Sequence, residues 1–308
     1  MSDIILHHYD ASPFTQKALR MLGLKRLSWR SVETPMLPPK DDLTALTGGY
    51  RGTPVMQIGA DVYIDTQRIA MELERRFPAP TFFPGGDPGI ALMLVKWSEA
   101  FFRSGLTLSV NLLAKHWPEP FTADRRALFP DFDFDGALRD ASHARSQLRV
   151  HAGWLDAQLA DGRAYLTGAQ PGLADIQAHV FVWMARAYFP DVAGALLAPF
   201  TKLERWEQAV SALGEGHRSA MSAAEAHSIA RSASPQSSGL VIDGADPLAL
   251  AAGARVEVAP DDTMRGGVKG ELVALTWDGV SVRRSDPRCG EVHVHFPRIG
   301  YRITPEIR

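Results

Sequence analysis

The chain has 308 residues, a formal net charge of −2 and a single cysteine, Cys289. This length predicts two or three domains, and the near-neutral charge without a basic stripe argues against nucleic acid as a partner. One cysteine excludes an intrachain disulfide framework and fits a reducing compartment. Because no apolar run approaches the ~20 residues that span a bilayer, and no signal peptide opens the chain, we expect a cytoplasmic protein without a membrane partner.

The first 82 residues alternate between strand and helix patterns, with turn residues between them. In chain order the predicted elements are a strand at 3–9, a helix from Ser12 and Pro13, a strand from Leu27, a weak helix within 33–49, a hairpin at 55–64 and a helix at about 67–77. The order β-α-β-α-β-β-α is typical of a thioredoxin-like α/β domain. We therefore predict such a domain over residues 1–82.

A segment rich in Gly and Pro at residues 82–89 predicts a linker. Beyond it, apolar residues recur at helical spacing, which predicts an all-helical bundle domain over residues 88–230. Four helices are expected, at about 90–112, 148–159, 176–187 and 203–213. Residues 117–135, rich in Pro, Phe and Asp, are expected to form an ordered loop.

Ser-rich residues 230–239 predict a flexible linker, and the hydrophobic period then changes to two. Residues 240–308 are thus expected to form a small all-β module, similar to an SH3-like barrel. His293 and His295 share a strand face that zinc could use, but no third ligand is evident. We interpret them as a solvated pair and predict no metal site.

Ser12-Pro13-Phe14 opens the first predicted helix. On its own, this motif indicates a helix cap, since Ser at the N-cap and Pro at the first position are favoured there. The same hydroxyl at a helix N-terminus also suits an anion, because the helix dipole favours negative charge. A thiol held there would ionise more readily, and the thiolate is the nucleophile.

Two further motifs precede a strand and a helix. Thr53-Pro54 is an X-Pro bond of a kind that is usually trans, but a cis bond would turn the Thr53 N–H and C=O outward toward an extended ligand. Asp65 and Thr66 are each candidates for an ordinary N-cap. Alternatively, Thr66 would hold a carboxylate while Asp65 pairs with an α-ammonium.

In this order, on a thioredoxin-like pattern followed by helices, the three motifs resemble the soluble glutathione transferase superfamily over residues 3–230. The resemblance implies glutathione as co-substrate and a homodimer. It implies that Ser12 hydrogen-bonds the glutathione sulfur and that Thr53, with Pro54, pairs with the cysteinyl backbone. Asp65 and Thr66 would hold the γ-glutamyl end, and Arg51 would bind the glycine carboxylate. Asp-Thr stands where members more often have Glu-Ser.

The residue that activates the thiol is either Ser12 or Tyr9. Tyr9 lies near where tyrosine-type members place their phenol, but the Ser-Pro-Phe context resembles serine-type members more closely. We favour Ser12, with Tyr9 as a pocket wall or substitute donor. No cysteine occurs at this turn, which argues against reductase chemistry.

Residues 166–176 are similar to the family's capping-box signature, with Gly172 where a Ser or Thr usually stands. A glycine cap costs only a few tenths of a kcal/mol relative to Ser or Thr, so we expect the helix to form. Asp175 is therefore interpreted as structural.

The predicted function is attack of the glutathione thiolate on a small hydrophobic electrophile bound against the first long helix. Phe102 is a candidate for that pocket, whereas Trp97 and Phe101 suit the core better. The alternative is a non-catalytic scaffold that uses the C-terminal β-module for partner contacts. In a third interpretation, the module is a lid or a dimer element.

Overall fold

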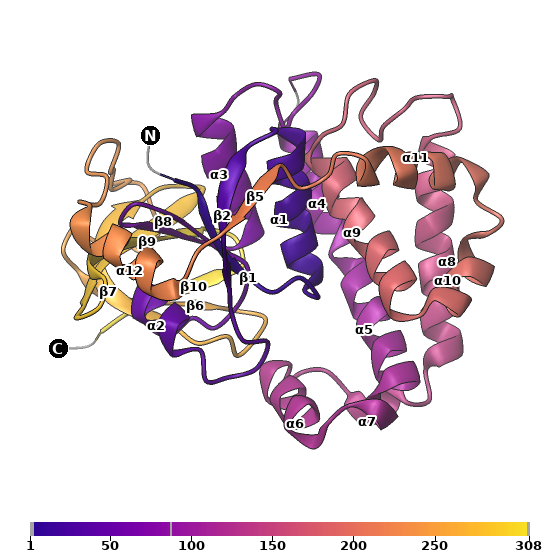
Figure 1. Cartoon of the computed structure of the whole chain (residues 1–308), viewed down its shortest axis with the longest axis horizontal. Coiled ribbons are helices and arrows are strands. Elements are labelled where there is room, and N and C mark those ends of the chain that lie inside the picture. Colours follow the sequence, from indigo (N-terminus) through magenta and orange to yellow (C-terminus); the bar gives the residue numbers. More distant parts are fainter. Residues whose placement is uncertain (1–2, 87, 307–308) are drawn as a thin grey trace.

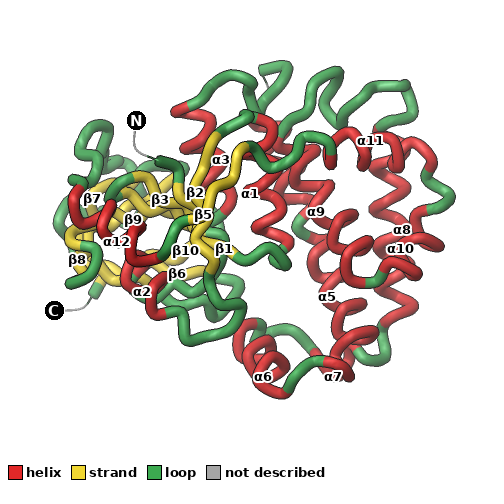
Figure 2. Tube along the Cα trace, viewed as in Figure 1, coloured by secondary structure: helices red, strands yellow, loops and turns green. Residues whose placement is uncertain are grey.

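The computed structural model describes residues 3–86 and 88–306. A ten-stranded sheet with its covering helices forms one side of the molecule, and a helical bundle forms the other (Figures 1 and 2). The strands are β1 (Ile5–His8), β2 (Ser28–Glu33), β3 (Val55–Ile58), β4 (Asp61–Ile64), β5 (His217–Ala220), β6 (Arg255–Pro260), β7 (Val268–Leu275), β8 (Gly279–Asp286), β9 (Gly290–Pro297) and β10 (Tyr301–Pro305).

The helices fall into two groups, those that cover the sheet and those of the bundle. The sheet helices are α1 (Pro13–Leu24), α2 (Asp41–Thr47), α3 (Thr66–Arg76) and α12 (Ala223–Ser232). The bundle helices are α4 (Pro88–Ser98), α5 (Ala100–Leu113), α6 (Glu119–Leu128), α7 (Phe134–Ala137), α8 (Ala141–Gln158), α9 (Leu173–Tyr188), α10 (Pro190–Leu197) and α11 (Thr201–Ser211), with a 3-10 turn at Ala114–His116.

The thioredoxin-like arrangement predicted for the N-terminal residues is confirmed. Strand β1 pairs in parallel with β2 and antiparallel with β3, and β3 and β4 form the predicted hairpin. Helices α1 and α3 share an apolar core with one face of this sheet, to which α4 and α9 also contribute. That shared core joins the N-terminal domain to the bundle.

The C-terminal residues 240–306, here called the C-terminal extension, contain the predicted strand-rich module. Its strands continue the N-terminal sheet, because β9 pairs in parallel with β4 and the sheet runs on as β8, β7, β6 and β10. Apolar side chains of the extension share one core with α2, β3 and β4. The segment predicted as a flexible linker begins within α12, which packs against β9.

A buried polar chain crosses the seam between β4 and the extension. His295 lies between Asp61 and Ser281, with its Nε2 2.9 Å from Asp61 Oδ1 and its Nδ1 2.7 Å from Ser281 Oγ. Its ring stacks on Tyr63 with the centroids 4.7 Å apart. The prediction of a solvated pair was wrong, because His293 and His295 are both buried where β9 joins β4.

The helical bundle is present, with more elements than the sequence pattern predicted. The first long helix is divided at Glu99 into α4 and α5, and α10 is an additional helix. The expected loop at residues 117–135 is mostly helical, because it contains α6 and the start of α7. No described helix has the length and hydropathy needed to cross a membrane.

Asp175 has the structural role that we predicted. Its buried carboxylate accepts hydrogen bonds from the N–H groups of Leu166 (2.7 Å) and Gly172 (3.0 Å) and from Trp206 Nε1 (2.8 Å). Gly172 is required by packing, since a Cβ atom there would lie 2.9 Å from the carbonyl oxygen of Phe82 and 2.8 Å from Pro84 Cδ. A serine or threonine cap would not fit at this domain contact.

We expect Gly172→Ala to destabilise the protein by about 1–3 kcal/mol, because the added methyl group overpacks the contact with Phe82 and Pro84. The matched control is Gly194→Ala in α10, where, apart from its own helix backbone and chain neighbours, no atom of the described residues lies within 4 Å of the position that a Cβ would take. That change should be neutral or stabilise by up to about 1 kcal/mol. Urea unfolding of both variants measures the difference, and equal stability of the two would contradict the packing argument.

Buried histidines should make stability fall in mild acid. Burial lowers the pKa of His7, His8 and His179 from 6.5 to about 4. Below pH 6.5 the unfolded chain therefore binds protons that the folded chain does not. The contribution of these three neutral histidines to the free energy of unfolding is complete above pH 6.5 and is lost as the pH falls through about 4.

Between pH 7 and 5.5, where most carboxyl groups stay ionised, each of these histidines should lower the free energy of unfolding by roughly 1 kcal/mol. Urea unfolding at both pH values measures the change. In the variant His179→Gln the free energy of unfolding should decrease less than in wild type, because one of the three buried histidines is absent. A stability independent of pH over this interval would show that these rings are not held neutral.

Candidate active site

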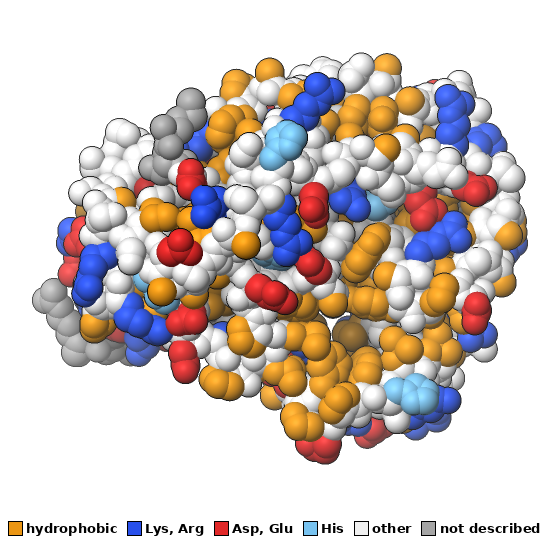
Figure 3. All heavy atoms as spheres, viewed as in Figure 1, with side chains coloured by type: hydrophobic (Ala, Val, Ile, Leu, Met, Phe, Trp, Pro, Cys, Tyr) orange, Lys and Arg blue, Asp and Glu red, His pale blue; other side chains and the backbone are white. Residues whose placement is uncertain are grey.

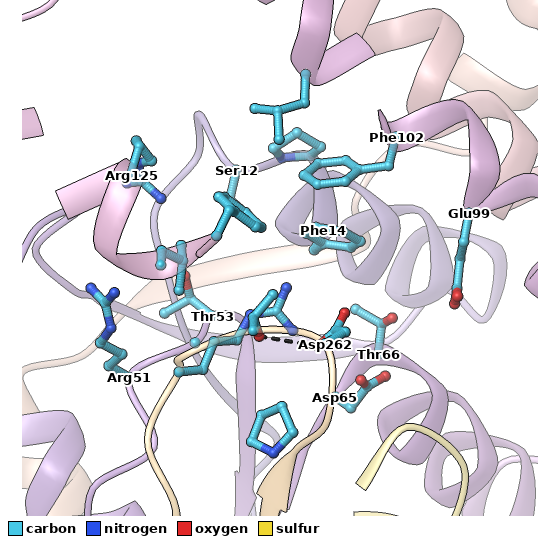
Figure 4. A pocket seen from close by; sticks show the side chains of 18 of the residues that line it. Ser12, Phe14, Arg51, Thr53, Asp65, Thr66, Glu99, Phe102, Arg125 and Asp262 are labelled. Carbon is cyan, nitrogen blue, oxygen red and sulfur yellow. Dashed lines mark hydrogen bonds between the residues drawn. The ribbon is translucent and has the colours of Figure 1, made fainter. Parts of the chain in front are cut away.

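One cavity of about 670 Å³ lies where the N-terminal domain, the bundle and the C-terminal extension meet. Its volume is within the range of small-molecule sites. All residues that the sequence assigned to the site line it, namely Tyr9, Ser12, Arg51, Thr53, Pro54, Asp65 and Thr66. The surface around its mouth is rich in hydrophobic side chains near α6 (Figure 3), and Figure 4 shows the interior.

Ser12 is the N-cap of α1 and lies at the cavity wall. Its backbone is extended, with φ −78° and ψ 125°, and its Oγ accepts a hydrogen bond from the N–H of Thr15 (3.3 Å). The side chain is buried from bulk solvent but reaches the cavity. The Oγ–H can therefore donate to an anion, while the positive end of the helix dipole points the same way.

Tyr9 lies close to Ser12, because the Ser12 N–H donates to the Tyr9 carbonyl oxygen (3.2 Å). Its ring is partly buried, and the Nζ of Lys40 lies 5.4 Å from the ring centroid. Both candidate thiol donors thus face the same cavity. Their positions are consistent with either assignment.

The Thr53-Pro54 peptide bond is cis, as the sharper of our two interpretations predicted. Within the described residues, neither the N–H nor the C=O of Thr53 takes part in a backbone hydrogen bond. Val55, two residues later, starts the ladder of β3. The Thr53 backbone groups are therefore available to an extended ligand.

Asp65 is the N-cap of α3, so the ordinary structural role is present. Its Oδ1 accepts from the Gln67 N–H (2.8 Å), and its φ of 76° places the backbone in the left-handed region. The Oδ2 atom accepts from the Tyr301 hydroxyl (3.3 Å). Thr66 follows at the first position of α3 and is buried at the cavity.

Arg51 lies on the other side of Thr53 from Asp65 (Figure 4). Its guanidinium pairs with Asp124 of α6 at 2.5 Å, and its Nε donates to the Met264 carbonyl oxygen at 3.4 Å. The arginine therefore ties the N-terminal domain to α6 and to the extension. A second cation, Lys40, also lines the cavity, and burial, with Arg125 and Arg51 nearby, lowers its pKa to about 8.

Lys17 is a cavity residue that the sequence analysis missed. It is 2% exposed, and burial lowers its pKa to about 8 against the opposing effect of Asp65 and Glu99. Phe14, three residues earlier on α1, also lines the cavity. Helical spacing from Phe14 could have indicated this residue, because positions i and i+3 share a face.

The apolar wall comes from the bundle. Phe102 lines the cavity with its ring 5.4 Å from that of Phe14 and 6.0 Å from that of Phe129. Trp97 and Phe101 belong instead to the bundle core, as we expected. The α6 region adds further side chains that our loop prediction did not assign to the site, namely Trp117, Phe121, Leu128 and Phe132.

The extension supplies a third part of the wall, from residues 260–263, Arg265 and 299–301. No local sequence signal places these residues near Asp65, because their position depends on the pairing of β9 with β4. Among the described residues, no group of three or more His, Cys, Asp or Glu side chains could hold a metal ion.

Family models match both major parts of the chain. The model of the glutathione S-transferase N-terminal domain matches residues 6–81, and that of the C-terminal domain matches residues 123–209. Comparison with curated proteins finds no match.

Solved structures extend this likeness. A GST-like protein from Pseudomonas syringae is 34% identical, with 99% of this chain and 100% of that chain covered and a TM-score of 0.81. A glutathione S-transferase from Rhodospirillum rubrum F11 is 21% identical over 68% of this chain and 87% of its own, with a TM-score of 0.53. A glutathione transferase from Phanerochaete chrysosporium is 20% identical over 69% and 98%, also at 0.53.

The last two structures share the fold, whereas the Pseudomonas protein matches this chain nearly from end to end. Together with the two domain models, that match establishes the relationship. The chain belongs to the glutathione S-transferase family.

Proposed function

We propose that the protein is a serine-type glutathione transferase that joins the glutathione sulfur to a hydrophobic electrophile. The observation that carries this proposal is the position of Ser12 Oγ, at the N-terminus of α1, in the same cavity as the unpaired backbone of Thr53. A tripeptide lying along Thr53 would present its sulfur to that helix end. The negative charge of a thiolate is favoured there.

In the proposed reaction, the glutathione thiol gives its proton to solvent and Ser12 Oγ–H donates a hydrogen bond to the resulting thiolate. The Oγ lone pair already accepts from the Thr15 N–H, which orients the hydroxyl. The thiolate then attacks an electrophilic carbon and a C–S bond forms. In a substitution the bond from that carbon to its leaving group breaks and the leaving group takes the electron pair; in an addition the π electron pair moves to the neighbouring atom, which takes a proton from solvent. Tyr9 is the substitute donor at the same wall.

The two ends of glutathione would be held on opposite sides of Thr53. Asp65 and Thr66 lie on one side and suit the ammonium and carboxylate of the γ-glutamyl group. Arg51 lies on the other, with Lys40 also in the cavity, and would attract the glycine carboxylate. The hydrophobic electrophile would lie against Phe102 and the apolar side chains of α6, where it is removed from water.

We also infer that the protein acts in the cytoplasm as a homodimer. The single, buried cysteine fits a reducing compartment. The dimer rests on the family alone. Glutathione binding without turnover on any electrophile would instead favour the scaffold function.

Ser12→Ala should lower kcat/KM for conjugation of a generic electrophile by roughly 100-fold, because one donor to the thiolate is lost. The pKa of bound glutathione should rise by about 1–2 units, which a pH titration of the thiolate ultraviolet absorbance measures. Tyr9→Phe is the matched control and should change both quantities little. If Tyr9→Phe causes the loss and Ser12→Ala does not, the protein is of the tyrosine type.

Asp65→Asn should weaken glutathione binding by about tenfold or more, because the charge that faces the ammonium is removed. The melting temperature should change little, since Asn is as good an N-cap as Asp. Asp133→Asn is the matched control, because Asp133 caps α7 outside this cavity. Calorimetric dissociation constants that are equal for the two variants would remove Asp65 from the binding site.

A further inference from the structure

The loop between β6 and β7, residues 261–267, is fixed against the N-terminal domain and the bundle. The Arg51 N–H donates to the Arg265 carbonyl oxygen (2.8 Å), and the Met264 N–H donates to that of Leu128 (3.0 Å). Gly266 has φ +89°, and a Cβ atom there would lie 2.3 Å from the Gly49 carbonyl oxygen. The loop therefore has a defined position directly beside the segment that leads to Thr53.

That position brings Arg265 to the end of the cavity where Asp65 lies. The residue is partly buried, and, against the opposing effect of burial, the nearby Tyr50, Tyr301, Asp262 and Asp65 raise the pKa of its guanidinium. It also lies 6.0 Å from the centre of the Phe14 ring. Tyr301, from the neighbouring strand of the extension, donates to Asp65 Oδ2 (3.3 Å). The extension thus contacts Asp65 through Tyr301, and Arg265 lines the same cavity.

The charge on Arg265 has no close counterion among the described residues. Among the residues that the structure describes, no carboxylate oxygen lies within 4.0 Å of this guanidinium, whereas Arg51 next to it in space is paired with Asp124. No carboxylate of the described residues therefore occupies the donors of this guanidinium, although its surroundings favour its charged form. Its planar set of donors suits a carboxylate in particular.

We propose that Arg265 binds the α-carboxylate of the γ-glutamyl group, so that the C-terminal extension completes the glutathione site. This inference rests on the proposed function. The γ-glutamyl group has an ammonium and a carboxylate on one carbon, and the cavity offers Asp65 and Arg265 at one end. Arg265 lies beyond residue 209, where the second family model ends. The extension is then a part of the binding site rather than a separate module for partner contacts.

The test compares glutathione with cysteinylglycine, which lacks the γ-glutamyl group, by calorimetry. Arg265→Gln should weaken glutathione binding by about 10- to 100-fold and leave cysteinylglycine binding unchanged. Arg265→Lys, which keeps the charge, should have a smaller effect. Arg302→Gln is the matched control, because it removes an exposed arginine of the same extension that does not line the cavity.

A second pair of variants keeps Arg265 and moves its loop. Gly266→Ala should weaken glutathione binding through the clash with Gly49, whereas Gly253→Ala should not. Gly253 has a similar φ of +80°, but apart from its chain neighbours no atom of the described residues lies within 4 Å of a Cβ position, so it controls for backbone strain. Melting temperatures show whether each variant is folded.

The following results would overturn the proposal. Equal glutathione affinity of wild type and Arg265→Gln removes Arg265 from the site, and does so without affecting the proposed function. Equal weakening of glutathione and cysteinylglycine shows that the arginine does not act on the γ-glutamyl group. If Arg265→Gln leaves the glutathione affinity unchanged but raises the KM for a carboxylate-bearing electrophile, Arg265 binds the carboxylate of the second substrate instead. Absence of glutathione binding to wild type would overturn the proposed function as well.

Discussion

The parallel pairing of β9 with β4 is the interaction on which the arrangement of the site depends. It places the extension on the edge of the N-terminal sheet, and the buried contacts of His295 with Asp61 and Ser281 hold the two strands in one register. The apolar face of the extension then closes over the same core as α2 and β3. Because the buried ring of His295 and the apolar face of the extension find their partners on the N-terminal domain, the extension is packed against the domain that would bind glutathione.

Three parts of the chain give the cavity three different kinds of surface. The N-terminal domain contributes the end of helix α1 at Ser12 and the unpaired backbone at Thr53, which can recognise an anion and an extended peptide. The bundle contributes aromatic side chains such as Phe102, which can bury an apolar group. The extension contributes charge, through Arg265, and positions Asp65 through Tyr301. A thiol activated at the first surface would meet an electrophile at the second.

Much of the fold and of the candidate site could be predicted because the relevant signals are local. Ser12, the cis Thr53-Pro54 bond and the cap at Asp65 are each properties of a few adjacent residues, and all three lie on the same cavity. The α6 region was missed because its Pro and aromatic residues are unfavourable in isolated helices, and tertiary packing overrides that preference. Gly172 departs from the usual cap for a reason that is not local, which is the close approach of Phe82.

The sequence by itself determined the order of elements in the N-terminal domain, the helix caps at Ser12 and Asp65, and the short motifs on which the family resemblance rests, since these depend on backbone preferences and hydrophobic period within one segment. Only the tertiary structure decided that His295 is buried against Asp61, that Arg51 pairs with Asp124, and that Tyr301 donates to Asp65. Each of these contacts joins residues that are far apart in the chain. Such contacts depend on the register between β4 and β9, which is set by the packing of complete faces against one another.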